Sequence, residues 1–324
     1  MKTGRRALLA AVGAAVGAEV GAAVGAEVGA ASASRGVLAR PASAQRQALT
    51  TMRHSAFPYE GTVPDTGLPF LDTTQDGQIG HMSARGGFYA AQTTYSDSRS
   101  LLHVGAACRG SHSSYVVVFF HGNGATLARD VILRQRVAEQ FDASGIDGVL
   151  IAPQLAVDAW DSSAGHFWDS RFAPRYLDEA FGHLAPMSGL PLEALQRSRV
   201  VLVAYSGGYL PLSYCLNEDG LGTRLAGVVL LDALYGEQER FERWITTHHR
   251  RAFFVSVWGN SSLSENVAFN LALARRNIEV QTRAPQRLAG GGVWSVPSLG
   301  AEHMDFVTRA WVDDPLRDLL SRMR

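Results

Sequence analysis

The sequence predicts an α/β fold, in which a mostly parallel central sheet carries helices on both faces. From residue 115 onward, short apolar runs alternate with helix-compatible segments, as parallel strands joined by crossover helices do. The runs are apolar at successive positions, as in Tyr115–Phe120, which indicates strands buried on both faces. Before them, Phe88–Ser96 and Leu101–Cys108 are strand-like, and the turn signal Asp97–Arg99 between them predicts an N-terminal antiparallel hairpin.

The elements after the hairpin alternate in type. We expect strands at Tyr115–Phe120, Gly148–Pro153, Val200–Tyr205, Gly227–Leu231, Ala252–Trp258 and Ile278–Thr282. We expect helices at Ala125–Ser144, at Arg175–Leu184 or Leu192–Arg197, directly after Ser206, and at Glu237–Thr246, Ser264–Arg275 and Phe306–Met323.

Length and composition bound the organisation of the chain. Its 324 residues are 46% hydrophobic, enough for one large α/β domain, which we place at residues 88–324. Residues 45–87 are rich in Pro, Gly, Asp and Thr and are expected to form an irregular N-terminal arm. The formal net charge is zero, which gives no indication of a nucleic-acid partner. Of the two cysteines, Cys108 and Cys215, we expect two buried free thiols rather than a disulfide.

Residues 1–44 have the pattern of an export signal followed by a low-complexity segment. A basic start containing Arg5 and Arg6 precedes the apolar run Ala7–Ala18, which is too short to span a bilayer. The arginine pair resembles a twin-arginine signal, although the general secretory route stays open. Small-residue cleavage sites follow at Ala31–Ala33 and Ala42–Ala44. We therefore expect a periplasmic or secreted protein with no membrane span after signal removal.

The segment around Ser206 carries the main indication of chemistry. The apolar run Val200–Tyr205 predicts a buried strand, and it ends in a serine flanked by small residues before a helix-compatible segment. This is the layout of a nucleophile elbow, here with Ala204 and Gly208 two positions either side of the serine. The tight turn requires small residues there, because the helix passes close to the strand.

The hairpin, the alternating elements and this elbow together resemble the α/β-hydrolase superfamily, over roughly Phe88 to Arg324. The resemblance implies a serine hydrolase with its catalytic residues in the order serine, acid, histidine. Ser206 would be the nucleophile. His303 would be the base, because it lies between the final strand and the final helix of the predicted order. No cofactor is implied.

The acid of the implied triad has two candidates. Asp232 directly follows the strand that ends at Leu231, where active-site groups gather in open α/β sheets. The more common family position is one strand later, and there Glu265 is the only carboxylate between Gly259 and Glu265. We favour Asp232, because Glu265 is expected in the first turn of a helix.

The resemblance also implies an oxyanion hole and a substrate pocket. Asn123, in the loop His121–Gly124, and Gly207 would donate backbone amides to the developing negative charge, with Gly124 as an alternative to Asn123. Aromatic residues that could line a pocket are Trp160, Phe167, Trp168 and Tyr205. No metal-ligand spacing and no phosphate-binding loop are found in the sequence.

The sequence therefore predicts an exported hydrolase that cleaves carboxylic esters, of small molecules or polymers, through an acyl-enzyme. Two alternatives remain open at this point. One is an amidase or peptidase acting on peptide or cell-wall material. The other is a catalytically silent binding protein of the same fold, and the presence of all three triad residue types in order argues against it.

Overall fold

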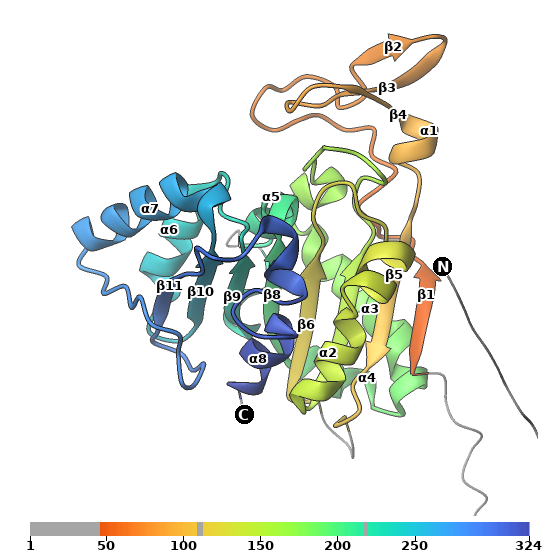
Figure 1. Cartoon of the computed structure of the whole chain (residues 1–324). Helices are drawn as coiled ribbons and strands as arrows, with labels where there is room; N and C mark the ends of the chain where they lie inside the picture. The colour runs from red at the N-terminus through yellow and green to blue at the C-terminus, as the bar shows by residue number, and fades with distance from the viewer. Residues whose placement is uncertain (1–45, 109–112, 217–219, 324) are drawn as a thin grey trace, which may run out of the picture. The chain divides into compact units, whose positions relative to one another are not determined.

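The computed structural model describes residues 46–108, 113–216 and 220–323 of the chain (Figure 1). The expected export signal, with Arg5 and Arg6, lies outside the described residues. All described residues belong to one compact unit, Ser43–Arg324. Among them, none of the helices combines the length and the apolarity that crossing a bilayer requires.

A mixed central sheet organises the described part of the chain. Its strands lie in the order β1-β5-β7-β6-β8-β9-β10-β11. The strand β5 pairs antiparallel with both β1 and β7, and every other pair is parallel. The bounds are β1 Gln47–Thr51, β5 Arg99–Val104, β6 Tyr115–Phe120, β7 Gly148–Pro153, β8 Arg199–Tyr205, β9 Leu225–Leu231, β10 Phe253–Trp258 and β11 Val293–Pro297.

Helices cover both faces of this sheet, as the sequence predicts. They are α2 Val137–Ser144, α3 Phe172–Ser188, α4 Leu192–Arg197, α5 Tyr209–Tyr214, α6 Gln238–His248, α7 Leu263–Arg275 and α8 Pro315–Ser321, with a π-helical segment at Leu127–Arg134. The short helix α1 Ala91–Thr94 contacts Gln78–Met82 and Phe88–Ala90 instead.

The core has two layers because side chains alternate along each strand. In β6, Val116 and Val118 pack on the face covered by α3, α5, α6 and α7, whereas Val117 and Phe119 pack on the face covered by α2 and α8. Burial on both faces explains why these strands are apolar at every position.

The antiparallel pairs involve other residues than the expected hairpin. Phe88–Ala90 forms β4, which pairs with β3 (Gln78–Met82), whereas the expected partner segment forms β5 of the central sheet. The difference follows from burial: Leu101 and Leu102 are completely buried, while the residues of β4 are half-buried. The edge strand β1 pairs with β5 although its sequence, QALTT, is too polar to suggest a strand.

Two elements near the C-terminus also differ from the prediction. Within Ile278–Thr282 only Gln281 forms an isolated bridge, and the eighth strand is β11, because there the side chains of Val293 and Trp294 are buried. The expected helix Phe306–Met323 is two pieces, His303–Val307 and α8. The second piece begins at Pro315, which disfavours helical backbone in the residue before it.

A small antiparallel sheet is formed by β4, from a segment expected to be a strand, and by two strands within the arm that was expected to be irregular. It consists of β2 Thr73–Gln75, β3 Gln78–Met82 and β4. Figure 1 shows it beyond the end of the central sheet at which α5 begins. Aromatic contacts hold its base: the Phe70 ring lies 4.4 Å from that of His81 and 4.9 Å from that of Tyr95. We call residues 58–90 the cap segment.

Candidate active site

Ser206 follows β8 directly and has the backbone of a nucleophile elbow. Its φ is 53°, in the left-handed region that non-glycine residues rarely adopt and that is found at strained functional turns. The turn leads at once into α5, which passes close to β6. A Cβ atom on Gly208 would collide with the carbonyl group of Phe120, so this position requires glycine.

His303 joins Ser206 to a buried carboxylate. Its Nε2 atom lies 2.8 Å from the Ser206 hydroxyl oxygen, and its Nδ1 atom lies 2.6 Å from Oδ2 of Asp232. The imidazole therefore faces a hydroxyl on one side and a carboxylate on the other. It begins a short helical segment, His303–Val307, after β11. The structure thus brings together the serine, acid and histidine that the sequence suggested.

Asp232 is completely buried and receives several hydrogen bonds. Its Oδ1 accepts from the Gly259 amide at 3.1 Å and from the Ser262 hydroxyl at 2.6 Å. Its Oδ2 accepts from the Ser261 hydroxyl and, at 3.3 Å, from the Tyr235 hydroxyl. Burial alone would raise the pKa of this carboxyl group, but the hydrogen bonds from His303, Ser261, Ser262 and Gly259 outweigh burial and lower the pKa to about 2.

The loop after β10 thus supplies donors to the acid that follows β9. Gly259, Ser261 and Ser262 belong to this loop, the place where the sequence offered Glu265 as an alternative acid. Glu265 itself is half-buried in the first turn of α7, where its carboxylate accepts a hydrogen bond from Ser264 at 2.8 Å. The carboxylate beside His303 is that of Asp232.

The backbone of Gly207, the residue after Ser206, lies close to Asn123 of the loop after β6. Gly207 lies against Asn123, and a Cβ atom on Gly207 would collide with the Asn123 side-chain amide. The Ser162 hydroxyl donates to Asn123 Oδ1 at 3.1 Å, which fixes that amide. The N–H of Gly124, the alternative donor, already donates to the Ala159 carbonyl at 2.7 Å. The amide of Asn123 is therefore the better candidate of the two.

The buried ring of His121 holds this loop in place through hydrogen bonds. Its Nδ1 lies 2.9 Å from the Gly122 carbonyl, and its Nε2 accepts the Leu155 amide at 2.9 Å. Since a carbonyl can only accept, Nδ1 carries the proton and the ring is neutral. Burial lowers the pKa of His121 to about 4. These contacts assign it a structural role.

The four aromatic residues suggested for the pocket have different surroundings. Trp160 is 65% exposed, and Trp168 lies at the wall of a cavity. Phe167 was expected in the pocket wall, but it is buried in the core, where its ring lies 5.2 Å from that of Phe120, because the loop folds back onto the sheet. Tyr205 is also buried, so it does not line a pocket; its ring stacks on that of His303 at 5.2 Å and its hydroxyl donates to the His303 carbonyl.

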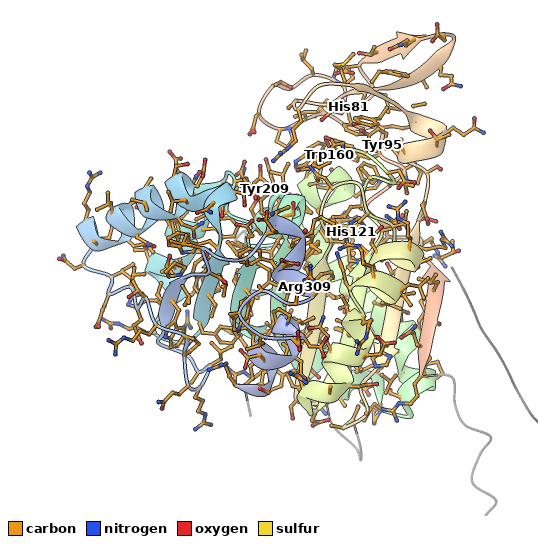
Figure 2. All side chains as sticks on the ribbon, in the orientation of Figure 1. His81, Tyr95, His121, Trp160, Tyr209 and Arg309 are labelled. Atoms are coloured by element: carbon orange, nitrogen blue, oxygen red, sulfur yellow. The ribbon has the colours of Figure 1, made fainter. Side chains whose placement is uncertain are left out.

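A cavity of about 440 Å³ lies between the cap segment and the elbow. Its walls include Leu68, Met82 and Arg85 from the cap segment, Ser162 from the loop after β7, and Tyr209 from α5. Figure 2 labels Tyr209 at the top of the central sheet and His81 and Trp160 in the region facing it. Ser162 contacts Asn123, so the cavity adjoins the candidate oxyanion hole.

Sequence reasoning missed Tyr235, Ser261, Ser262 and the cap segment. The serines could have been found from their place directly after a buried strand, where polar side chains collect at the site edge. The cap segment gave no such signal, because its aromatic contacts join residues far apart in the chain. The cysteines are as expected: Cys108 and Cys215 are both buried free thiols.

The strand order, with Ser206, Asp232 and His303 after β8, β9 and β11, is that of an α/β-hydrolase fold. No protein-family model matches the chain, and no curated protein matches it.

Solved structures with a similar fold include several esterases. An esterase from Thermogutta terrifontis with bound butyrate is 16% identical, covering 64% of this chain and 80% of its own, with a TM-score of 0.39. An S-formylglutathione hydrolase from Agrobacterium tumefaciens is 13% identical over 78% of this chain and 98% of its own, with a TM-score of 0.46. A feruloyl esterase module from Clostridium thermocellum is 12% identical over 83% and 98%, with a TM-score of 0.44.

Proposed function

We propose that the protein is a serine hydrolase that cleaves carboxylic esters through an acyl-enzyme. The observation that carries this proposal is the continuous hydrogen-bonded chain from Ser206 through His303 to Asp232, with distances of 2.8 and 2.6 Å. A serine hydroxyl is a weak nucleophile until a neighbouring base takes its proton, and the base needs a third group to orient it.

In the first half of the reaction, Ser206 Oγ attacks the ester carbonyl carbon while its proton passes to His303 Nε2. The C–O bond to the alcohol then breaks, and the departing alcohol takes that proton from His303. An acyl group remains on Ser206. Asp232 holds the proton of His303 on Nδ1 and stabilises the imidazolium, because its low pKa keeps it ionised.

In the second half, a water molecule takes the place of the alcohol. It gives one proton to His303 Nε2 as its oxygen attacks the acyl carbonyl, and the bond to Ser206 Oγ breaks as His303 returns the proton to the serine. In the proposed mechanism, the amides of Asn123 and Gly207 donate hydrogen bonds during both halves to the carbonyl oxygen, which becomes negative. Each such donor contributes roughly 10²–10³-fold to the turnover number.

The proposal is tested with neutral p-nitrophenyl esters of increasing acyl length and with matched anilides. Ester cleavage by the wild-type protein, lost in Ser206→Ala, supports it. Faster cleavage of the anilides would favour the amidase or peptidase alternative instead. An inactive wild-type protein that binds the esters would favour a silent binding protein.

A second proposal concerns export, and the pattern at residues 1–44 supports it. If Arg5 and Arg6 are read as a twin-arginine signal, Arg5→Lys together with Arg6→Lys should retain the protein in the cytoplasm while preserving the charge. Cell fractionation measures the outcome. Unchanged export in the double variant would favour the general secretory route, and cytoplasmic wild-type protein would contradict export altogether.

A further inference from the structure

The cavity beside the elbow has an arginine in its wall. Arg85 belongs to the turn between β3 and β4 of the cap segment, and hydrogen bonds within this turn fix its shape. The Gly86 amide donates to the Ser83 carbonyl at 2.8 Å, and the Arg85 amide donates to the Ser83 hydroxyl oxygen at 3.2 Å. That hydroxyl in turn donates to the Trp160 carbonyl at 2.8 Å, which ties the turn to the loop after β7. The backbone of Arg85 is therefore held at a defined place.

Tyr235 connects the guanidinium of Arg85 with the candidate catalytic residues. It stands over the Tyr235 ring, 5.6 Å from the ring centroid. The hydroxyl of the same tyrosine is 3.2 Å from His303 Nδ1. Tyr209, which begins α5 after the elbow, also lines the cavity, and its ring centroid is 6.2 Å from that of Tyr235.

This guanidinium forms no ion pair with any residue that the structure describes. The carboxylates in the cavity wall are engaged elsewhere. Asp161 accepts hydrogen bonds from Tyr95 at 2.8 Å and from Ser163 at 3.0 Å. Asp72 accepts from the Met82 amide at 3.0 Å and lies 3.4 Å from His81.

The third carboxylate of the wall, that of Asp65, is exposed and lies near Tyr214, at the end of α5 opposite to Tyr209. Among the described residues, the cavity wall therefore contains two carboxylates with internal partners, the exposed carboxylate of Asp65, and the guanidinium of Arg85, which forms no ion pair.

From this arrangement we infer that the preferred substrate is an ester carrying a second group, a carboxylate, which Arg85 binds while the ester lies at Ser206. The inference rests on the proposed function and adds the substrate class. Arginine suits the task because its planar fork of N–H donors matches a carboxylate in a bidentate way. The cation–π contact with Tyr235 orients the guanidinium without neutralising its charge.

The test uses pairs of esters that differ only in charge. One set consists of the mono-p-nitrophenyl esters of dicarboxylic acids from succinic to suberic. Each is paired with the p-nitrophenyl ester of the same chain length in which the free carboxylate is replaced by a carboxamide. The series of lengths allows the carboxylate to reach Arg85 from the acyl side. The other pair is 3-carboxyphenyl butyrate and 3-carbamoylphenyl butyrate, in which the charge lies on the alcohol side. The measured quantity is the ratio of kcat/KM for carboxylate over carboxamide.

We expect the wild-type protein to prefer the carboxylate in one of the two sets. Arg85→Ala should lower kcat/KM for that carboxylate ester by about 10- to 100-fold, the range expected for loss of hydrogen bonds to a charged group. The carboxamide partner should change little, which controls for folding. Arg85→Lys should recover part of the loss. Arg197→Ala, an exposed arginine in the last turn of α4, should behave as wild type.

The inference is overturned if the wild type shows no preference for a carboxylate, or if Arg85→Ala lowers both members of each pair equally. These results leave ester hydrolysis itself intact, because the carboxamide esters are still cleaved. If the wild type cleaves none of the esters, the proposed function fails, and the inference that rests on it fails as well.

Discussion

Asp232 and Glu265 are two carboxylates that follow neighbouring strands, β9 and β10, at the same edge of the central sheet. Asp232 is completely buried, accepts hydrogen bonds from three hydroxyl groups and one amide, and touches His303. Glu265 is only half-buried at the start of a helix, and its carboxylate accepts a hydrogen bond from the Ser264 hydroxyl. The same functional group can thus be a candidate catalytic acid or a surface charge, and the difference lies in its donors.

The loop after β10 therefore takes part in the candidate site without holding the acid. Its residues Gly259, Ser261 and Ser262 donate to Asp232 from across the sheet edge. Without these donors, a buried carboxylate would be protonated more readily and would lose its hold on His303. The loop after β9 thus provides the carboxylate of Asp232, and the loop after β10 provides the hydrogen-bond donors that keep this carboxylate ionised.

The largest expected effect is that of Asp232→Asn. The amide preserves the shape of the side chain but favours the wrong tautomer of His303, and turnover should fall by about 10⁴-fold, as the equivalent change does in a serine protease. Ester hydrolysis under saturating substrate measures it. Turnover within tenfold of wild type would remove Asp232 from the triad.

The second largest effect should come from removing two hydroxyl groups that donate hydrogen bonds to Asp232. Ser261→Ala combined with Ser262→Ala leaves the carboxylate buried with fewer hydrogen bonds, and turnover should fall by about tenfold, corresponding to the order of one hydrogen bond to a charged group. The matched control is Ser264→Ala, which removes the hydroxyl that bonds Glu265 and should not change turnover. Equal rates in the double variant and the control would show that the loop after β10 does not support the acid.

How far the sequence predicts this site depends on the distance between the residues that form it. Ser206 is recognisable because its strand, turn and small neighbours are contiguous. Asp232 and His303 are suggested by the order of strands. The donors to Asp232 were missed, because the place of Ser261 after a buried strand indicates only that it lies at the sheet edge, and its contact with Asp232 crosses to the neighbouring strand.

The fold shows the same limit. Strands buried on both faces, such as β6 and β8, are predicted well, since short continuous apolar runs are typical of buried strands. The edge strand β1 and the small sheet were missed, because their short and half-exposed strands are specified by pairing with distant partners. The cap segment, and with it most of the cavity wall, therefore came only from the structure.

A smaller effect should appear in the pH dependence of stability. The pKa of Asp232 is about 2 in the folded chain, against an ordinary value of 3.8, so ionised Asp232 stabilises the fold above pH 3.8 and that contribution is lost as the pH falls toward 2. Between about pH 5 and about pH 3 the loss should be about 1 kcal/mol. Urea unfolding of the wild type and Asp232→Asn at both values measures it. The stability difference between the two should shift by this amount, and parallel pH profiles would contradict the low pKa.

The smallest effect is that of Glu265→Gln. It removes a half-buried charge from the first turn of α7, which should cost less than about 1 kcal/mol of unfolding free energy and leave turnover within about tenfold of wild type. A variant that loses most of its activity while Asp232→Asn stays active would transfer the role of the acid to the loop after β10.

The central claim, that Ser206 is a nucleophile activated by His303, is tested most directly with a fluorophosphonate probe, which reacts covalently with activated serines. The wild-type protein should be labelled, and peptide mass spectrometry should place the adduct on Ser206. Ser206→Ala, folded as judged by circular dichroism, should not be labelled, and His303→Ala should be labelled far more slowly. An adduct on another residue, or equal labelling of Ser206→Ala and the wild type, would contradict the account.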